Sequence, residues 1–377
     1  MLLKRFLYIL LLLSLKSYGQ KDTGLVFNSL NQALLNPSMV KSLDLSDQKL
    51  TKLPEDVAKL KNLEQIDIGE NPCLDLSQAF DVLKYTEGLK ILRLTKCQIK
   101  IIPENISQLK NLEELWLDDN ELVLFPEAVK QLKKLTFLSL FDNKIKNINF
   151  KKQDLPALTC INLCYNKFEK FPVQLSVLPG LKKIIIWYNE IAEIPRGIGR
   201  FKQIEDINLE HNNLMVLPKR FAQLKSIRTL SLRGNKLTDK SISVVYKLYN
   251  LKDLDLQSNN ISSIPVNIKN LGMLERLSLC DNPLKDLPVE LKQVITLQQL
   301  GLGDLHQLNW KNAFLVMEKL PNLRRVGMYS MELATMPAGF EKLRQVETFW
   351  LTFNSFNNNE QRRIQEMAPK AQIDFSN

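Results

Sequence analysis

Residues 112–122, which read "LEELWLDDNEL", decide how this chain of 377 residues folds. They follow the pattern L-x-x-L-x-L-x-x-N-x-L, in which leucines recur at set intervals and an asparagine stands ninth. The pattern occurs fourteen times, beginning at Val40, Leu63, Leu89, Leu112, Leu135, Leu158, Leu181, Ile204, Ile227, Leu251, Leu274, Leu297, Leu323 and Val346. Most intervals are 23 residues long, and the others are 24 or 26. This period indicates a repeat architecture in which each unit packs only against its neighbours.

A single unit cannot bury its own apolar residues. In the unit that starts at Leu112 these residues are Leu112, Leu115, Leu117, Leu122, Phe125, Val129 and Leu132. Stacked units enclose such side chains in a continuous core, while each L-x-L segment pairs in parallel with the next, about 4.8 Å away. Nine units begin their return segment with a proline, which suits the first turn of a short helix.

The asparagine at the ninth position is predicted to be structural. It recurs in ten units, at positions 71, 120, 143, 166, 189, 212, 235, 259, 282 and 354. Its amide has two donors and one acceptor group, enough to satisfy the backbone where the chain leaves the strand and turns. The exceptions are Gln48, Cys97, Leu305 and Met331, and we expect a local irregularity between Leu297 and Met331.

The second half of many units reads L-P-x-x-I-x-x-L, as in "LPEDVAKLKNL" from Leu53 and "IPENISQLKNL" from Ile102. In both halves the chain resembles the leucine-rich-repeat family in its 23-residue form, over residues 40 to about 360. The resemblance implies an α/β solenoid, a horseshoe with a concave parallel sheet and short helices or turns on its convex side. It says almost nothing about function, because the family hosts many unrelated roles.

The ends of the chain suggest a leader and two caps. In residues 1–19, two basic residues precede a short apolar run and small residues, which is typical of a signal peptide cut before Gln20. An uncleaved N-terminal anchor is the alternative. Residues 20–39 are predicted to be an N-terminal cap with a short amphipathic helix over 25–35, residues 40–356 the solenoid, and residues 357–377 a C-terminal cap with a helix and a last strand.

The leader predicts export through the secretory pathway, to the periplasm, the cell surface or the medium. No cysteine precedes Cys73, so no lipid anchor is expected at the cleavage site. The apolar run in the leader is shorter than the roughly 20 residues that a membrane-spanning helix needs, and no later segment comes closer. We therefore expect no membrane span in the mature chain.

The stretch "IIIWYN", residues 184–189, shows which side chains should face a partner. Because side chains alternate along a strand, Ile184 and Ile186 point into the core while Ile185 and Trp187 point away from it. The same frame places a set of apolar residues on the concave face and predicts a partner-binding patch exposed to water: Trp116, Phe137, Phe141, Tyr165, Ile185, Trp187 and Tyr188. Tyrosine and tryptophan dominate interface energetics, which favours a binding role. The alternative is cross-strand aromatic packing.

A second predicted partner-binding cluster consists of Tyr329, Trp350 and Phe353, near the C-terminal end. Here the alternative is apolar packing beneath the cap.

The predicted solenoid carries different charges on its different faces. The formal net charge is +10, yet acidic residues outnumber basic ones at the concave positions. Basic residues share one corner position just before the strands: Lys61, Lys110, Lys133, Lys202, Lys225 and Arg344. They form either a rail for anionic partners or ordinary solvated residues at helix C-termini, where cations are favoured, and we favour the second reading. Nucleic acid is not an expected partner, because the aromatic residues lie among acids rather than bases.

Catalytic chemistry is not indicated. The two histidines, His211 and His306, lie four units apart and cannot share a metal ion. The five cysteines do not form a disulfide framework, and Cys73 is expected to replace an inward leucine. Motifs for nucleophilic serine, phosphate or zinc chemistry are lacking. We therefore expect no enzyme, no cofactor, no metal and no catalytic residues.

The leading hypothesis is an exported, non-enzymatic scaffold that binds a protein or peptide ligand through the aromatic patch. One alternative is a structural or adhesive surface component that binds glycan or another polyanion through the basic corners. An intracellular signalling scaffold is a third possibility if the N-terminus is not cleaved.

Overall fold

The computed structural model describes residues 25–376. The predicted signal peptide, residues 1–19, lies outside the described residues. The chain divides into two compact units, and each is described by itself: unit 1 comprises residues 25–168 and 177–185, and unit 2 comprises residues 169–176 and 186–376.

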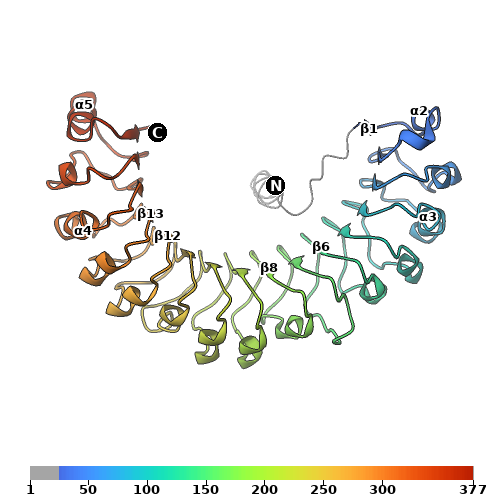
Figure 1. Cartoon of the computed structure of the whole chain (residues 1–377), viewed down its shortest axis with the longest axis horizontal. Coiled ribbons are helices and arrows are strands. Elements are labelled where there is room, and N and C mark those ends of the chain that lie inside the picture. The colour runs from blue at the N-terminus through green and yellow to red at the C-terminus, as the bar shows by residue number, and fades with distance from the viewer. Residues whose placement is uncertain (1–24, 377) are drawn as a thin grey trace. The chain divides into compact units, whose positions relative to one another are not determined.

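Each unit is built from short parallel strands that pair in chain order (Figure 1). The strands of unit 1 are β1 (Val26–Phe27), β2 (Ser42–Asp44), β3 (Gln65–Asp67), β4 (Ile91–Arg93), β5 (Glu114–Trp116), β6 (Phe137–Ser139), β7 (Cys160–Asn162) and β8 (Lys183–Ile185). Those of unit 2 are β9 (Asp206–Asn208), β10 (Thr229–Ser231), β11 (Asp253–Asp255), β12 (Arg276–Ser278), β13 (Gln299–Gly301), β14 (Arg325–Gly327), β15 (Thr348–Trp350) and β16 (Gln372–Asp374). The register advances by one repeat per strand, so that Leu115 pairs with Leu138 and Leu254 with Leu277.

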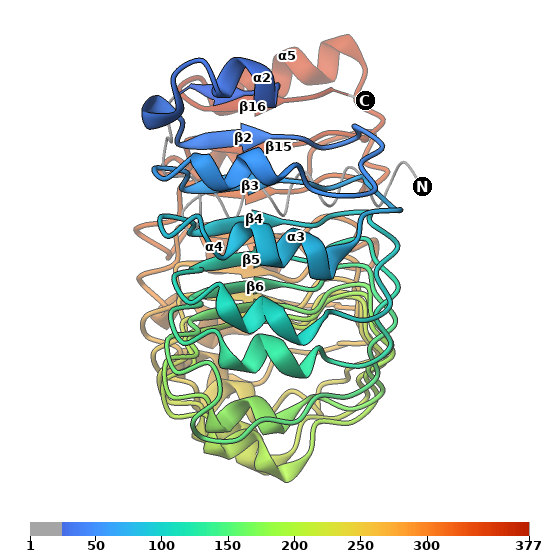
Figure 2. The same cartoon turned by 90° about the vertical axis from the view of Figure 1, so that its right-hand side faces the viewer.

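Short helices follow the strands on one side of each unit, and Figure 2 shows them beside β2 to β6. Most are 3₁₀ helices: η1 (Pro37–Met39), η2 (Glu55–Lys59), η3 (Glu104–Gln108), η4 (Glu127–Gln131), η5 (Val173–Val177), η6 (Arg196–Arg200), η7 (Lys219–Gln223), η8 (Val245–Lys247), η9 (Val266–Asn270), η10 (Val289–Gln293) and η11 (Phe340–Lys342). The α-helices are α2 (Leu30–Ala33), α3 (Leu76–Leu83), α4 (Trp310–Met317) and α5 (Asn358–Met367). Together with the strands these helices confirm the predicted leucine-rich-repeat solenoid fold.

The repeat leucines form the core. All seven apolar positions of the unit that starts at Leu112 are buried. Ile184 and Ile186 are likewise fully enclosed, as alternation along the strand predicts. Leucine spacing alone was therefore sufficient to find the buried face.

The ninth-position asparagine joins neighbouring repeats. The amide nitrogen of Asn143 donates to the carbonyl oxygens of Leu117, at 3.0 Å, and Leu140, at 3.2 Å. Its amide oxygen accepts the backbone N–H of Leu122 at 3.0 Å. In unit 2, the amide of Asn189 donates to the carbonyl of Ile186 at 3.2 Å. The structural role predicted for these asparagines is confirmed, because one amide satisfies backbone groups of two successive repeats.

The return segments differ from expectation in two details. Proline lies one residue earlier than predicted, at the N-cap, where the carbonyl of Pro126 accepts the N–H of Val129 at 3.1 Å. The 26-residue units replace the 3₁₀ helix by the eight-residue helices α3 and α4, because three additional residues allow a longer return. In the second of these units, the N–H of Leu305 contacts the sulfur of Met331 at 3.0 Å instead of an asparagine, which is the expected irregularity.

The insertion before α3 also corrects a prediction about Cys73. That residue is exposed, and Leu74 takes the inward position instead. At the N-terminal end, the segment predicted as one helix forms the strand β1 and the single turn α2. At the C-terminal end, α5 and β16 occupy the region where a helix and a strand are predicted.

Candidate functional site

The helices of each unit lie on one side of its strands and leave the other side without helices (Figure 1). We call that other side the open face. The third, fifth, seventh and eighth positions of each repeat present their side chains there, because the leucines between them point into the core.

The part of the predicted aromatic patch that belongs to unit 1 is mostly buried. Trp116, Phe137, Phe141 and Ile185 are each at most 6% exposed, and only Tyr165 remains half-buried. The rings lie against one another: Trp116 and Phe137 have centroids 4.6 Å apart, and Phe141 and Tyr165 5.2 Å apart. Bulky side chains on strands about 4.8 Å apart fill the space above the sheet and cover each other. The expectation that these four side chains are exposed to water is therefore wrong.

Polar neighbours complete this packing around Trp116. The guanidinium of Arg93 lies 5.5 Å from the ring of Trp116. The indole nitrogen of Trp116 donates to the carboxylate of Glu114 at 3.4 Å. These contacts indicate a structural role for Trp116, because its ring is packed against neighbours and its indole N–H has a hydrogen-bond partner.

The part of the patch that belongs to unit 2 likewise consists of one buried and one half-buried residue. Trp187 is 6% exposed, which again contradicts the expected exposure, whereas Tyr188 is half-buried. Their rings are 5.3 Å apart, and Tyr188 stacks on the imidazole of His211 at 4.3 Å. Burial raises the pKa of Tyr188, and burial beside Arg233 lowers the pKa of His211. The imidazole is therefore a neutral stacking surface at neutral pH.

The second predicted cluster is the more accessible of the two. Phe353 is 61% exposed, and Trp350 and Tyr329 are half-buried. The ring of Tyr329 lies so close to Gly303 that a Cβ atom there would be 2.5 Å from it. Its hydroxyl group is hydrogen-bonded to the thiol of Cys280, and burial raises the pKa of both groups.

Tyr165, Tyr188 and Phe353 also share an unusual backbone. All three occupy the eighth position of the repeat, where φ is +51°, +52° and +56° respectively. Every other repeat has the same left-handed conformation at this position, with aspartate, serine, histidine, glycine, glutamate or lysine there, as at Asp142, Gly234, Glu70 and Lys96. A bulky aromatic residue there costs more than aspartate or glycine would.

A polar group on the open face of unit 2 was not anticipated from the sequence. It consists of Ser231, Arg233 and Asp255, on β10, the turn after it and β11. The buried Oγ of Ser231 and the buried Nε of Arg233 have no hydrogen-bond partner among residues 25–376. Burial raises the pKa of Asp255 to about 6. The sequence signal for this group is a run of short side chains at the fifth position of successive repeats, from Ser231 to Gly327.

Four of the six basic corner residues, Lys61, Lys133, Lys202 and Lys225, bind the protein's own backbone. The ammonium group of Lys202 donates to the carbonyl of Gly199 at 3.0 Å, and that of Lys133 to the carbonyl of Gln153 at 2.9 Å. Lys225 donates to the carbonyl of Lys247 at 3.1 Å, and Lys61 to that of Tyr85 at 3.2 Å. These contacts favour the interpretation of ordinary helix C-terminal cations over a rail for anions.

The histidines and cysteines have structural neighbours. His306 contacts Asp304 at 2.8 Å, while all five cysteines are free thiols. In residues 25–376, no group of histidine, cysteine and acidic side chains is arranged to hold a metal ion. No helix within the same range is long and apolar enough to cross a membrane.

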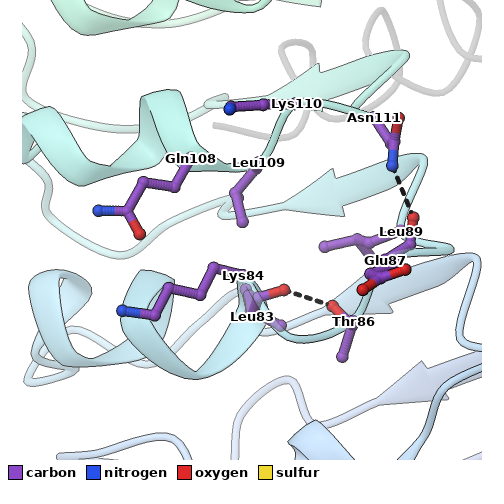
Figure 3. A pocket seen from close by; sticks show the side chains of 9 residues that line it. All are labelled: Leu83, Lys84, Thr86, Glu87, Leu89, Gln108, Leu109, Lys110 and Asn111. Carbon is purple, nitrogen blue, oxygen red and sulfur yellow. Dashed lines mark hydrogen bonds between the residues drawn. The ribbon is translucent and has the colours of Figure 1, made fainter.

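A surface pocket of about 390 Å³ lies in unit 1, between the end of α3 and the end of η3 (Figure 3). Leu83, Leu89 and Leu109 form its apolar part, and Lys110 lies at its margin. Hydrogen bonds between neighbouring segments stabilise the walls of the pocket. For example, the amide of Asn111 donates to the carbonyl of Glu87 at 2.8 Å. The pocket is a gap between successive return segments, away from the open face, and it contains none of the predicted site residues.

Comparisons with known proteins agree with this geometry. Models of the leucine rich repeat match residues 179–237 and residues 250–271. The chain is a leucine-rich-repeat protein. A comparison with curated protein sequences finds no match.

Solved structures extend the likeness of this leucine-rich-repeat chain to nearly its whole length. The LRR protein LIC12759 of Leptospira interrogans is 29% identical, with a TM-score of 0.69, and the match covers 93% of this chain and 100% of that protein. The internalin InlF of Listeria monocytogenes is 20% identical, with a TM-score of 0.64, covering 86% of this chain and 90% of that one. A plant peptide hormone receptor, RGFR1, solved in complex with RGF2, is 20% identical, with a TM-score of 0.58, covering 88% of this chain and 54% of the receptor.

Proposed function

We propose that the protein is an exported, non-enzymatic scaffold that binds a protein or peptide ligand on the open face of its sheet. Within the predicted sites, the residues of unit 2 that contact the ligand are the accessible aromatic ones: Tyr188, Tyr329, Trp350 and Phe353. Tyr165 is the accessible aromatic residue of unit 1 and packs against the buried Phe141. In unit 2 the buried Trp187 packs against Tyr188.

The observation that carries the proposal is the left-handed backbone under Tyr165, Tyr188 and Phe353. Left-handed residues other than glycine, asparagine and aspartate cost on the order of 1 kcal/mol or more, and such strain concentrates at functional sites. Stability alone favours aspartate or glycine at the eighth position. Three accessible aromatic rings at this position are therefore best explained by contact with a ligand, to which tyrosine contributes strongly.

The similar solved structures support the binding of a protein or peptide in general terms. One of the structures with the same fold is a plant receptor in complex with RGF2. An open sheet face with accessible aromatic rings is a surface of the sort that protein ligands cover. The leader sequence in residues 1–19 supports export.

Affinity capture tests the proposal. The mature chain is immobilised as wild type, as the variant Tyr188→Ala and as the variant Trp350→Ala/Phe353→Ala, and captured proteins or peptides are identified by mass spectrometry from an envelope extract. The ligand should be retained by the wild type, and at least one aromatic variant should lose it. Because these side chains are partly exposed, the unfolding temperature of both variants should stay within a few degrees of the wild type.

The exposed Lys269→Ala on η9 is the matched control, because this side chain lies on the helical side. Capture that is unchanged in both aromatic variants would contradict the proposed site. Loss of capture at moderate salt in the wild type would indicate binding through basic corners instead. N-terminal sequencing of the natural protein tests export, since a chain that starts at Met1 would contradict cleavage.

A further inference from the structure

The N-terminal end of unit 1 carries apolar side chains that the described part of the chain leaves uncovered. Residues 25–39 form β1, the single turn α2 and η1, which make up the last layer of the unit beyond β2 (Figure 1). Ala33 is the one buried residue of this layer. Four large apolar side chains are instead 47–77% exposed: Leu25, Val26, Leu35 and Met39. The end of a solenoid ordinarily presents a polar outer face, so this end is unusual.

The same layer has no charged side chain. Residues 25–39 contain no acidic residue, no basic residue and no histidine, whereas 24% of the whole chain is charged and its formal net charge is +10. The excess positive charge therefore lies elsewhere. Two copies of a basic protein repel each other where their basic surfaces meet, but this end places no charge opposite a like charge. A second copy can approach it without that cost, whereas a strongly charged partner would find no counter-charge there.

The sheet edge at this end is open. β1 pairs with β2 on one side, and no strand among residues 25–376 lies on its other side. The peptide groups along such an edge are a template for another strand. Two identical edges related by a two-fold axis run antiparallel, so each can hydrogen-bond to the other and continue the sheet from one copy into the next.

The C-terminal end of unit 2 lacks these features. There α5 buries Ile364 completely, and its exposed residues include the charged Arg362 and Glu366. The last strand, β16, ends at Asp374. A charge on an edge strand opposes pairing with another chain. The contrast identifies the N-terminal end as the one that is suited to self-association.

The mature chain offers no apolar segment of its own to cover this end. If the signal peptide is cut before Gln20, residues 20–24 precede Leu25, and they contain no valine, leucine, isoleucine, methionine or aromatic residue. This step rests on the cleavage that the proposed function assumes. The exposed layer therefore suits the identical layer of a second copy, whose leucine and methionine side chains supply the missing apolar contacts.

We propose that the mature protein forms a two-fold symmetric dimer through residues 25–39. β1 of each copy pairs antiparallel with β1 of the other, and the exposed leucine, valine and methionine side chains of both copies pack around that pair. Because the contact is small, it belongs to the weak class of interfaces, with a dissociation constant in the micromolar range. It uses none of the residues proposed to bind a ligand, so a dimer presents two copies of that site.

Sedimentation equilibrium of the mature chain, residues 20–377, tests the dimer over a dilution series. The average mass should rise with concentration towards twice that of one chain. Leu35→Glu/Met39→Glu should lower the association constant about tenfold or more, because glutamates of both copies then meet in one contact. Leu124→Glu/Met215→Glu is the matched control, since these side chains are similarly exposed on other repeats, and it should leave the mass unchanged.

Disulfide cross-linking locates the contact independently of that variant. It is done in the background Cys73→Ser, because Cys73 is exposed and the other four cysteines are buried. Val26→Cys should give a covalent dimer under mild oxidation, since antiparallel pairing near the axis brings its two copies within the Cα separation of about 4.4–6.8 Å that a disulfide spans. Asn359→Cys, at an exposed position of α5, is the control and should remain monomeric.

Circular dichroism melting shows that each variant is folded. A mature chain that stays monomeric throughout the series would overturn the dimer, and so would cross-linking through Asn359→Cys in place of Val26→Cys. Association that survives Leu35→Glu/Met39→Glu, or that the control pair weakens equally, would also overturn it. A natural chain that starts at Met1 would do the same, because the leader then supplies apolar residues. Ligand capture should be unchanged in Leu35→Glu/Met39→Glu, so failure of the dimer and failure of the proposed ligand site are distinguishable.

Discussion

The open faces of units 1 and 2 use the same positions of the repeat in opposite ways. In unit 1, the fifth and seventh positions carry large rings, such as Trp116 and Phe141, which pack sideways and are buried. In unit 2, the fifth position carries serine, aspartate or glycine in five successive strands, and the ring of Tyr329 lies over Gly303 and beside Gly327. A side chain that points away from the core is therefore not necessarily exposed. Its neighbours on the adjacent strands decide how much of it reaches solvent.

The two regions also differ in how their outward side chains affect the stability of the fold. The aromatic layer of unit 1 behaves as a second, outer core, with ring contacts of 4.6 Å and 5.2 Å. The open face of unit 2 instead retains, among residues 25–376, two donor groups without a hydrogen-bond partner and a carboxyl group whose pKa is raised by burial. Such groups lower the stability of the fold, and the buried repeat core offsets their cost.

Replacing one tryptophan in each region tests the comparison most strongly. Trp116→Ala should lower the free energy of unfolding by ~3–5 kcal/mol, because it empties a buried site against Phe137. Trp350→Ala should cost less than half of that, since Trp350 is already half-exposed. Urea denaturation followed by circular dichroism measures both. Equal losses would mean that the two faces do not differ in burial.

The carboxyl group of Asp255 gives a pH-dependent effect. Its pKa in the folded chain is about 6, above the ordinary 3.8, so the folded state holds the proton more tightly than the unfolded state does. Stability should therefore fall as the pH rises from about 4 to 6, by up to ~3 kcal/mol. Asp255→Asn should remove this slope and stabilise the protein at pH 7.5. Thermal melts across this range, with Asp281→Asn at an exposed position as control, check the sign, and an unchanged slope in Asp255→Asn would contradict it.

Gly303 and Gly327 in unit 2 should respond differently to an added methyl group. Gly303→Ala should destabilise the chain by ~1–3 kcal/mol, because its methyl group would collide with the ring of Tyr329. Gly327→Ala should be neutral or slightly stabilising, since its methyl group has room and the unfolded chain loses freedom. Differential scanning calorimetry compares them. A large loss for Gly327→Ala would show that the fold itself requires that glycine.

The corner lysines should show the smallest effects, and equally in both units. Lys133→Ala in unit 1 removes bonds to the carbonyls of Gln153 and Lys130, and Lys202→Ala in unit 2 removes one part-buried bond to the carbonyl of Gly199. Each should cost less than ~0.5 kcal/mol in thermal unfolding. A difference between the two of more than 1 kcal/mol would indicate that the contrast between the units extends beyond the open face.

Prediction succeeded where neighbours along the chain decide the outcome. The burial of Ile184 and Ile186 and the contacts of Asn143 follow from the repeat pattern, and both are confirmed. It was wrong for the exposure of Trp116 and Trp187, which their packed surroundings bury. The second predicted cluster contains the most exposed of the predicted aromatic residues, Phe353, because the residues on adjacent strands leave its ring uncovered.

By itself, the sequence determined which side chains point into the core and which lie on the open face, because leucine spacing and the two-residue period of a strand leave only one consistent register. Only the tertiary structure decided which of the outward side chains reach solvent. That depends on how rings tilt against each other, at 41° for Trp116 and Phe137, and on whether the residue on the next strand fills the gap. The contact between Trp116 and Phe137 joins residues 21 positions apart, so no local pattern reports it.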